Sequence, residues 1–124
     1  LKWADMINNN KIPKCILTKS LKEVIVEMTQ KRLGITAVVD TGNKLIGIIT
    51  DGDLRRMLEK NTAIDSIKAG DIMTANPKTI EPDKLAVDAL NLLRKNEITQ
   101  LAVTANGNYE GILHLHDLIR EGLI

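Results

Sequence analysis

The 124-residue chain is 44% hydrophobic, and its 17 Lys and Arg residues against 16 Asp and Glu residues leave a formal net charge of +1. This length suits one compact domain or two small halves, and so small a net charge excludes the strong field that attracts nucleic acid or anionic membranes. A single cysteine excludes an internal disulfide and a four-thiolate zinc site, and no apolar run reaches the ~20 residues that span a bilayer. We therefore expect a cytoplasmic protein that binds neither nucleic acid nor a membrane.

The first half of the chain predicts a strand, a helix, a hairpin and a second helix. The apolar segment 14–17 follows Pro13 and is expected to be an edge strand. Ser20 is the candidate N-cap of a helix that stops at Gly34 and whose apolar residues recur at helical spacing, namely Leu21, Val24, Ile25 and Met28. The rest is expected as strands at 37–39 and 45–49, turn residues at 40–43 and a helix at 53–59.

The second half repeats the first. Residues 13–21 align with 77–85 and residues 47–54 align with 111–118, both at an offset of 64, whereas Ile35-Thr36 matches Ile98-Thr99 at an offset of 63. We attribute the slip of one residue to a loop of different length. The repeat predicts a first unit at 1–68 and a second unit at 69–124, which pack about a pseudo-two-fold axis with a ligand cleft at their junction.

The elements expected in the second half follow the same order. Asp83 is the candidate N-cap of a helix that contains Leu85, Ala89, Leu90 and Leu93. Strands are expected at 101–103 and 109–113 around turn residues 105–108, and a short helix is expected from Asp117. Segment 71–74 is expected to lead the chain into the second unit, and segment 5–7 is a shorter echo of it.

Thr50 and Asp53 lie where a strand is expected to give way to a helix. Such a junction presents free backbone N–H groups and the positive end of the helix dipole, so a phosphate group fits there. The same two residues also fit a helix cap, with Thr50 as the N-cap and Asp53 as an acid of the first turn. Only one of the following arginines, Arg55 and Arg56, can readily face a cleft, and Arg56 is the candidate.

His114, His116 and Asp117 occupy the matching place in the second half. On a continuing strand both imidazoles face one side, a spacing that two metal ligands can use. The sequence has no third histidine and no further cysteine to complete a metal site, so a satisfied or ligand-facing histidine pair is the favoured interpretation. A neighbouring phosphate would raise the pKa of His114, which makes this residue a candidate for a pH-sensitive contact with an anion.

The duplicated β-α-β-β-α unit, in which Gly-apolar-apolar-Thr-x-x-Asp ends the hairpin, resembles the CBS family, whose paired motifs form one ligand-binding module. The resemblance implies an α+β fold with tandem CBS motifs over nearly the whole chain. Segments 50–56 and 111–120 are similar to the CBS pair at the C-terminus of arabinose 5-phosphate isomerases. That likeness implies an N-terminal sugar-isomerase domain, absent from this sequence, which interconverts ribulose 5-phosphate and arabinose 5-phosphate in the supply of Kdo for lipopolysaccharide.

The resemblance also implies two clefts and a role for each motif residue. Thr50 is expected to bond phosphate or ribose, and Asp53 is expected to accept from ribose hydroxyls. His114 stands where the CBS motif has Thr or Ser, so the second unit departs from the standard adenosine site. The first cleft combines Thr50 and Asp53 with Lys78, Thr79, Ile80, Thr99 and Gln100, and the second combines His114 and Asp117 with Lys14, Cys15, Ile16, Thr36 and Ala37.

No nucleophile-elbow, phosphate-loop or dinucleotide-binding glycine motif occurs, so no catalytic residue and no required cofactor are assigned. The expected function is regulatory: an adenine or cytidine nucleotide (AMP, ATP) or the cytidine monophosphate ester of Kdo (CMP-Kdo) binds the clefts and tunes the attached isomerase, and the pair forms a homodimer. Two alternatives stay open. One is a structural role, dimerisation or bracing of the isomerase tetramer with empty clefts, and the other is a metal or small-anion sensor that uses His114 and His116.

Overall fold

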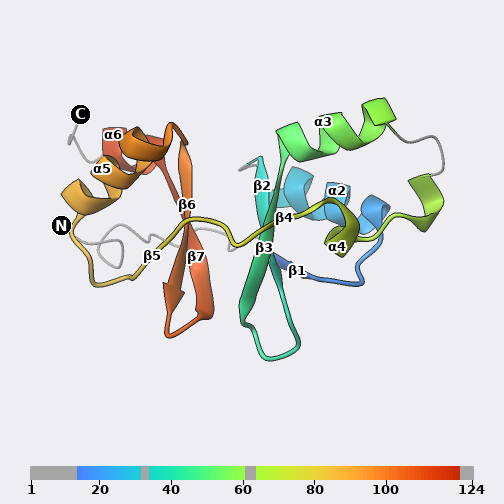
Figure 1. Cartoon of the computed structure of the whole chain (residues 1–124), viewed down its shortest axis with the longest axis horizontal. Helices are drawn as coiled ribbons and strands as arrows, with labels where there is room; N and C mark the ends of the chain where they lie inside the picture. Colours follow the sequence, from blue (N-terminus) through green and yellow to red (C-terminus); the bar gives the residue numbers. More distant parts are fainter. Residues whose placement is uncertain (1–13, 32–33, 61–63, 121–124) are drawn as a thin grey trace.

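The computed structural model describes residues 14–31, 34–60 and 64–120, so the predicted echo at 5–7 lies outside the described residues. Two β-sheets face each other across the centre of the molecule, and helices cover their outer faces (Figure 1). The predicted α+β class is confirmed by this arrangement. Within the described residues, no helix combines the length and apolar character needed to cross a membrane.

Each unit has the predicted order of strand, helix, hairpin and helix. The first unit consists of β1 (Lys14–Ile16), α2 (Leu21–Lys31), β2 (Ile35–Val39), β3 (Leu45–Thr50) and α3 (Asp51–Lys60). A connecting segment follows, with η1 (Ile64–Ser66), α4 (Ala69–Ile72) and β4 (Thr74–Ala75). The second unit consists of β5 (Thr79–Ile80), α5 (Ala86–Asn96), β6 (Gln100–Ala105), β7 (Asn108–His114) and α6 (Leu115–Arg120).

The first sheet has the order β1-β2-β3-β4 and the second has the order β5-β6-β7. In both sheets the opening strand runs parallel to its neighbour, and the hairpin strands are antiparallel. The first sheet has one extra strand, because β4 pairs with β3 through Gly47–Ala75 and Ile48–Thr74. The segment that leads into the second unit is therefore part of the first sheet.

The strand register shows that the two units correspond differently from the sequence alignment. Cys15 pairs with Val38, and Ile80 pairs with Val103. Val38 in turn pairs with Gly47, and Val103 pairs with Gly111. The offset is thus 65 before the hairpin turn and 64 after it. The predicted offsets of 64 for the opening strand and 63 for Ile35-Thr36 are wrong, because the single missing residue lies in the second hairpin turn.

Of the two predicted N-cap residues, one is confirmed by the structure and the other is wrong. Ser20 caps α2 as predicted, since its Oγ accepts the Glu23 N–H at 3.3 Å. Asp83 does not cap α5, because residues 81–84 form a turn, closed by the Lys84 N–H donating to the Glu81 carbonyl at 3.2 Å, and Leu85 becomes the N-cap. The prediction that the helix contains Leu85 is also wrong, because this residue precedes α5 as its N-cap and is 49% exposed.

Each unit has its own apolar core between its sheet and its helices. In the first unit Val24, Val38 and Ile49 are fully buried, whereas Ile25, predicted to share the buried stripe of α2, is 40% exposed. The core of the second unit has at its centre residues that are at most 2% exposed, which include Leu93, Leu101, Val103, Leu113 and Leu118. Neither core depends on an aromatic side chain, in keeping with a composition that is 2% aromatic.

A smaller apolar cluster joins the two sheets. Ala37 and Val39 of β2 pack with Tyr109 of β7, which is 3% exposed, and half-buried Leu45 and Ile112 border them. The hairpin turns are also bonded to each other, since the Tyr109 N–H donates to the Asn43 carbonyl at 2.9 Å, the Leu45 N–H to the Gly107 carbonyl at 3.1 Å and Lys44 Nζ to the Asn106 carbonyl at 2.9 Å. This seam fixes the two units relative to each other.

Candidate functional site

Thr50 is the last residue of β3, and Asp53 lies in the first turn of α3. The Thr50 N–H and the Thr50 hydroxyl both donate to Asp53 Oδ2, at 2.9 and 3.1 Å, and the Asp53 N–H donates to Thr50 Oγ1 at 3.2 Å. This is a reciprocal capping box with Asp in place of Glu. The helix-cap interpretation of these two residues is therefore confirmed.

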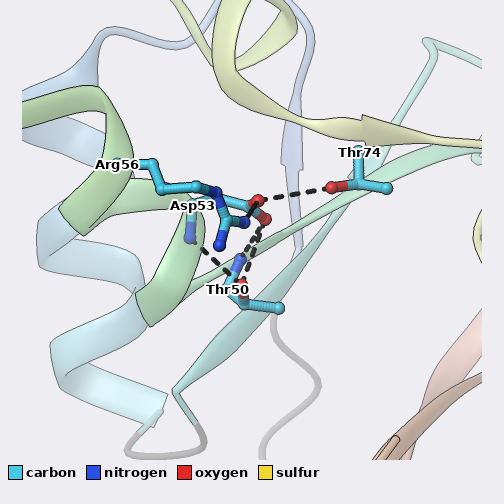
Figure 2. A network of polar contacts seen from close by, with 4 residues as sticks. All are labelled: Thr50, Asp53, Arg56 and Thr74. Atoms are coloured by element: carbon cyan, nitrogen blue, oxygen red, sulfur yellow. Dashed lines mark hydrogen bonds and ion pairs between the residues drawn. The ribbon is translucent and has the colours of Figure 1, made fainter. Parts of the chain in front are cut away.

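The other carboxylate oxygen of Asp53 binds residues outside the capping box (Figure 2). Arg56, one helical turn further on, forms an ion pair with Asp53 Oδ1 through Nη2, and the Thr74 hydroxyl of β4 donates to the same oxygen at 3.3 Å. Asp53 is 8% exposed, whereas the Arg56 side chain is 61% exposed. Arg56, the candidate arginine, therefore lies beside Asp53, and whether it faces a ligand stays a prediction. Thr74 was not predicted as a site residue.

The second unit contains part of the same network at an offset of 64. The His114 N–H donates to Asp117 Oδ2 at 2.7 Å, and Arg120 Nη2 donates to Asp117 Oδ1 at 2.9 Å. His114 also replaces the threonine as a capping side chain, because its Nδ1 accepts the His116 N–H at 3.0 Å. The strand–helix junction of each unit therefore holds an Asp–Arg pair beside a capped helix start.

The two histidines do not share one continuing strand, the case in which both imidazoles would face one side, because β7 ends at His114 and α6 begins at Leu115. Their rings nevertheless stack, with centroids 4.4 Å apart and planes inclined by 6°. Burial lowers the pKa of His114, the nearby His116 lowers it further, and Asp117 opposes both effects. An Nδ1 that accepts a hydrogen bond is unprotonated, so the geometry and the pKa agree on a neutral imidazole. In the part of the chain that the structure describes, no cluster of three metal-ligating side chains occurs.

The structure places the remaining candidates of the first cleft in the second unit. Thr79 and Ile80 form β5, preceded by exposed Lys78. Gln100 pairs with His114, and the Thr99 carbonyl accepts the Leu115 N–H at 2.7 Å, so both adjoin the His114 junction through the backbone.

The candidates of the second cleft lie on β1 and β2. Lys14 is exposed, and its Nζ donates to Asn43 Oδ1 at 3.4 Å. Ile16 is 47% exposed, whereas Cys15 is buried and Thr36 and Ala37 are fully buried. Burial raises the pKa of the Cys15 thiol to about 11, so Cys15 is an unreactive core residue at neutral pH.

Two cavities border these strands. One, of about 420 Å³, is lined in part by Lys14, Cys15 and Ile16, and the other, of about 500 Å³, is lined in part by Thr79 and Ile80. Neither of these two cavities is lined by a capping-box residue of either unit. The described geometry thus brings each motif together within its own unit, and the strand candidates form separate hollows.

A family model described as CBS domain matches the chain twice, at residues 5–60 and 69–123. Among similar curated proteins, arabinose 5-phosphate isomerase KdsD of Escherichia coli (strain K12) is 37% identical over 119 residues, which are 96% of this chain and 36% of that protein. The enzyme of the same name from Pseudomonas aeruginosa is 40% identical over 114 residues, 91% of this chain and 35% of that protein. The chain therefore spans about a third of the length of these relatives.

Two solved structures share the fold. A CBS domain protein from Pyrobaculum aerophilum, complexed with AMP, has a TM-score of 0.83 and 20% identity over 95% of this chain and 90% of that chain. A putative acetoin utilization protein, AcuB, from Vibrio cholerae has a TM-score of 0.86 and 20% identity over 99% of this chain and 90% of that chain. These likenesses confirm the predicted tandem arrangement of the two units.

Proposed function

The chain belongs to the CBS domain family as a tandem pair of CBS motifs, and from this premise we propose that it is the regulatory module of an arabinose 5-phosphate isomerase and binds a nucleotide or a nucleotide-activated sugar. The two motifs correspond to residues 1–68 and 69–124. The catalytic partner is an N-terminal sugar-isomerase domain, and the pair forms a homodimer in the cytoplasm.

The observation that carries the proposal is the Asp–Arg pair that stands at the strand–helix junction of both units. A carboxylate accepts hydrogen bonds from the two hydroxyls of a ribose, and a guanidinium offers several donors to a phosphate. The positive end of a helix dipole favours the same phosphate. Ribose and phosphate are the parts shared by AMP, ATP, CMP and CMP-Kdo, so the network supports the ligand class rather than one base.

Pathway position suggests which member of the class is the effector. An enzyme that supplies the precursor of Kdo is usefully inhibited by the activated end product, which is CMP-Kdo. The strand candidates are proposed to line the remainder of each site. These are Lys78, Thr79 and Ile80 in the first cleft, Lys14, Cys15, Ile16, Thr36 and Ala37 in the second, and Thr99, Gln100 and His116 at the His114 junction.

The second candidate function is structural, and one observation favours it. Both carboxylates are already engaged inside the protein, and both motifs cap a helix without any ligand. Capping alone stabilises a helix by about 0.5–2 kcal/mol, which is a sufficient reason for these residues. In that case the pair braces the isomerase assembly and the clefts stay empty.

Thermal unfolding with AMP, ATP, CMP and CMP-Kdo separates the two candidates. A ligand that binds only the folded state at 100 times its Kd adds about 2.7 kcal/mol, which corresponds to roughly 10 °C for a chain of 124 residues. We expect this shift to disappear in Asp53→Asn or Asp117→Asn, according to the site occupied. Asp83→Asn is the matched control, because Asp83 is exposed and caps no helix. A panel without any shift would overturn the regulatory proposal in favour of the structural one.

A further inference from the structure

The carboxylate of Asp53 has no hydrogen-bonding capacity left. An ionised carboxylate has about four lone-pair sites on its two oxygens. Oδ2 accepts from the Thr50 N–H and the Thr50 hydroxyl, and Oδ1 accepts from Arg56 and from the Thr74 hydroxyl (Figure 2). A ligand hydroxyl can therefore reach this carboxylate only if one of the four donors leaves.

Thr74 is the donor that can leave with the least disturbance. Thr50 and Arg56 belong to the same strand–helix junction as Asp53, whereas Thr74 comes from β4, which has two residues and pairs with β3 at only two positions. Thr74 is exposed, and its bond to Asp53 is the longest of the four at 3.3 Å. Arg56, by contrast, contributes a full charge to its contact with the carboxylate.

Asp117 differs from Asp53 in this respect. From the described residues it accepts only the His114 N–H and one Arg120 contact, and its side chain is 18% exposed against 7% for Asp53. Two further lone-pair sites are therefore open to a ligand at Asp117, as far as residues 14–31, 34–60 and 64–120 are concerned. A ligand hydroxyl can therefore reach the carboxylate of Asp117 more easily than that of Asp53.

We propose that Thr74 is a built-in competitor of the first site, whose hydroxyl holds the position on Asp53 Oδ1 that a ribose hydroxyl of the ligand takes. Binding then exchanges one hydroxyl for another and frees Thr74 from the site. Because Thr74 lies on the strand that leads into the second unit, occupancy of the first site acts directly on β4. This inference rests on the proposed binding of a ribonucleotide.

The test measures binding to the first site alone. The background is Asp117→Asn, which disables the second site. Isothermal titration with AMP, CMP and CMP-Kdo compares the protein that keeps Thr74 with the protein that carries Thr74→Val. This substitution keeps the shape of the side chain and removes its hydroxyl. We expect at least a five-fold lower Kd for the ribonucleotide that binds, and no change for its 2′,3′-dideoxy analogue. Thr74→Ala is the second variant, and Thr74→Ser restores the original affinity.

The matched control is Thr29→Val, since the Thr29 hydroxyl donates to the Ile25 carbonyl within α2 and has no contact with the site. Asp53-dependent binding that is unchanged or weaker in Thr74→Val would overturn the competitor role and leave the proposed function standing. Binding that is detectable only in Thr74→Val would support the competitor role strongly. If no ribonucleotide binds either protein, the proposed function and this inference fail together.

Discussion

Truncation of Tyr109 to alanine tests whether the two units depend on the seam between their sheets. Tyr109 is 3% exposed and packs with Ala37 and Val39 of the opposite sheet. Removal of a buried aromatic side chain costs about 3–5 kcal/mol, because apolar contacts are lost and a cavity remains. With an unfolding entropy of about 0.26 kcal/mol/K for 124 residues, we expect Tm to fall by roughly 12–19 °C.

Differential scanning calorimetry measures this shift and shows whether the two units still unfold in one transition. Tyr109→Phe keeps the ring in the seam, so we expect it to cost at most about 1.5 kcal/mol. Ile119→Ala is the control at an exposed apolar position, with 47% exposure and an expected change within about 0.5 kcal/mol. A fall in Tm of less than about 4 °C for Tyr109→Ala would refute the idea that the seam holds the units together.

Three further predictions concern the caps and the buried titratable groups. Thr50→Ala removes the acceptor of the Asp53 N–H and should lower the free energy of unfolding by about 0.5–2 kcal/mol in urea titration, whereas Thr50→Ser should retain it. The pKa of His114 is lowered from 6.5 in the folded state, so stability should fall as pH drops below about 6.5, and His114→Asn, which keeps a capping acceptor, should flatten that decline. The pKa of Cys15 is raised to about 11, so stability should fall as pH rises from 9 toward 11, and this loss should be absent in Cys15→Ala. Equal pH profiles for wild type and either variant would contradict these assignments.

The sequence predicted the elements well where a local signal and the packing agree. Ser20 is an example, because a serine N-cap precedes an apolar repeat of which Leu21, Val24 and Met28 form the buried face of α2. Asp83 shows how the same rule fails. A good capping residue stood near the helix start, but the turn at 81–84 was already closed by a backbone hydrogen bond, and the helix began two residues later than an Asp83 cap requires.

Long-range pairing accounts for what the sequence could not predict. The match of Ile35-Thr36 with Ile98-Thr99 compared residue types only. In the structure Ile35 lies opposite Thr50. The residue opposite His114, the counterpart of Thr50, is Gln100, so Gln100 is the true counterpart of Ile35. Thr74 reaches Asp53 over 21 residues only because β4 joins the first sheet. The one available signal was the predicted lead-in segment 71–74, which contains this residue without indicating its contact.

The hydrogen bonds between the two hairpin turns hold the units together at one end of the facing sheets. Both turns lie at one end of the facing sheets, and the strand ends that carry Thr50 and His114 lie at the other end (Figure 1). Five residue steps along β3 separate Leu45 from Thr50, a span of about 17 Å, so a rotation of about 5° around the turns displaces Thr50 by about 1.5 Å. A small tilt between the units therefore moves atoms very little at the turns. At the opposite end of the sheets the same tilt moves them by a distance large enough to form or break a hydrogen bond.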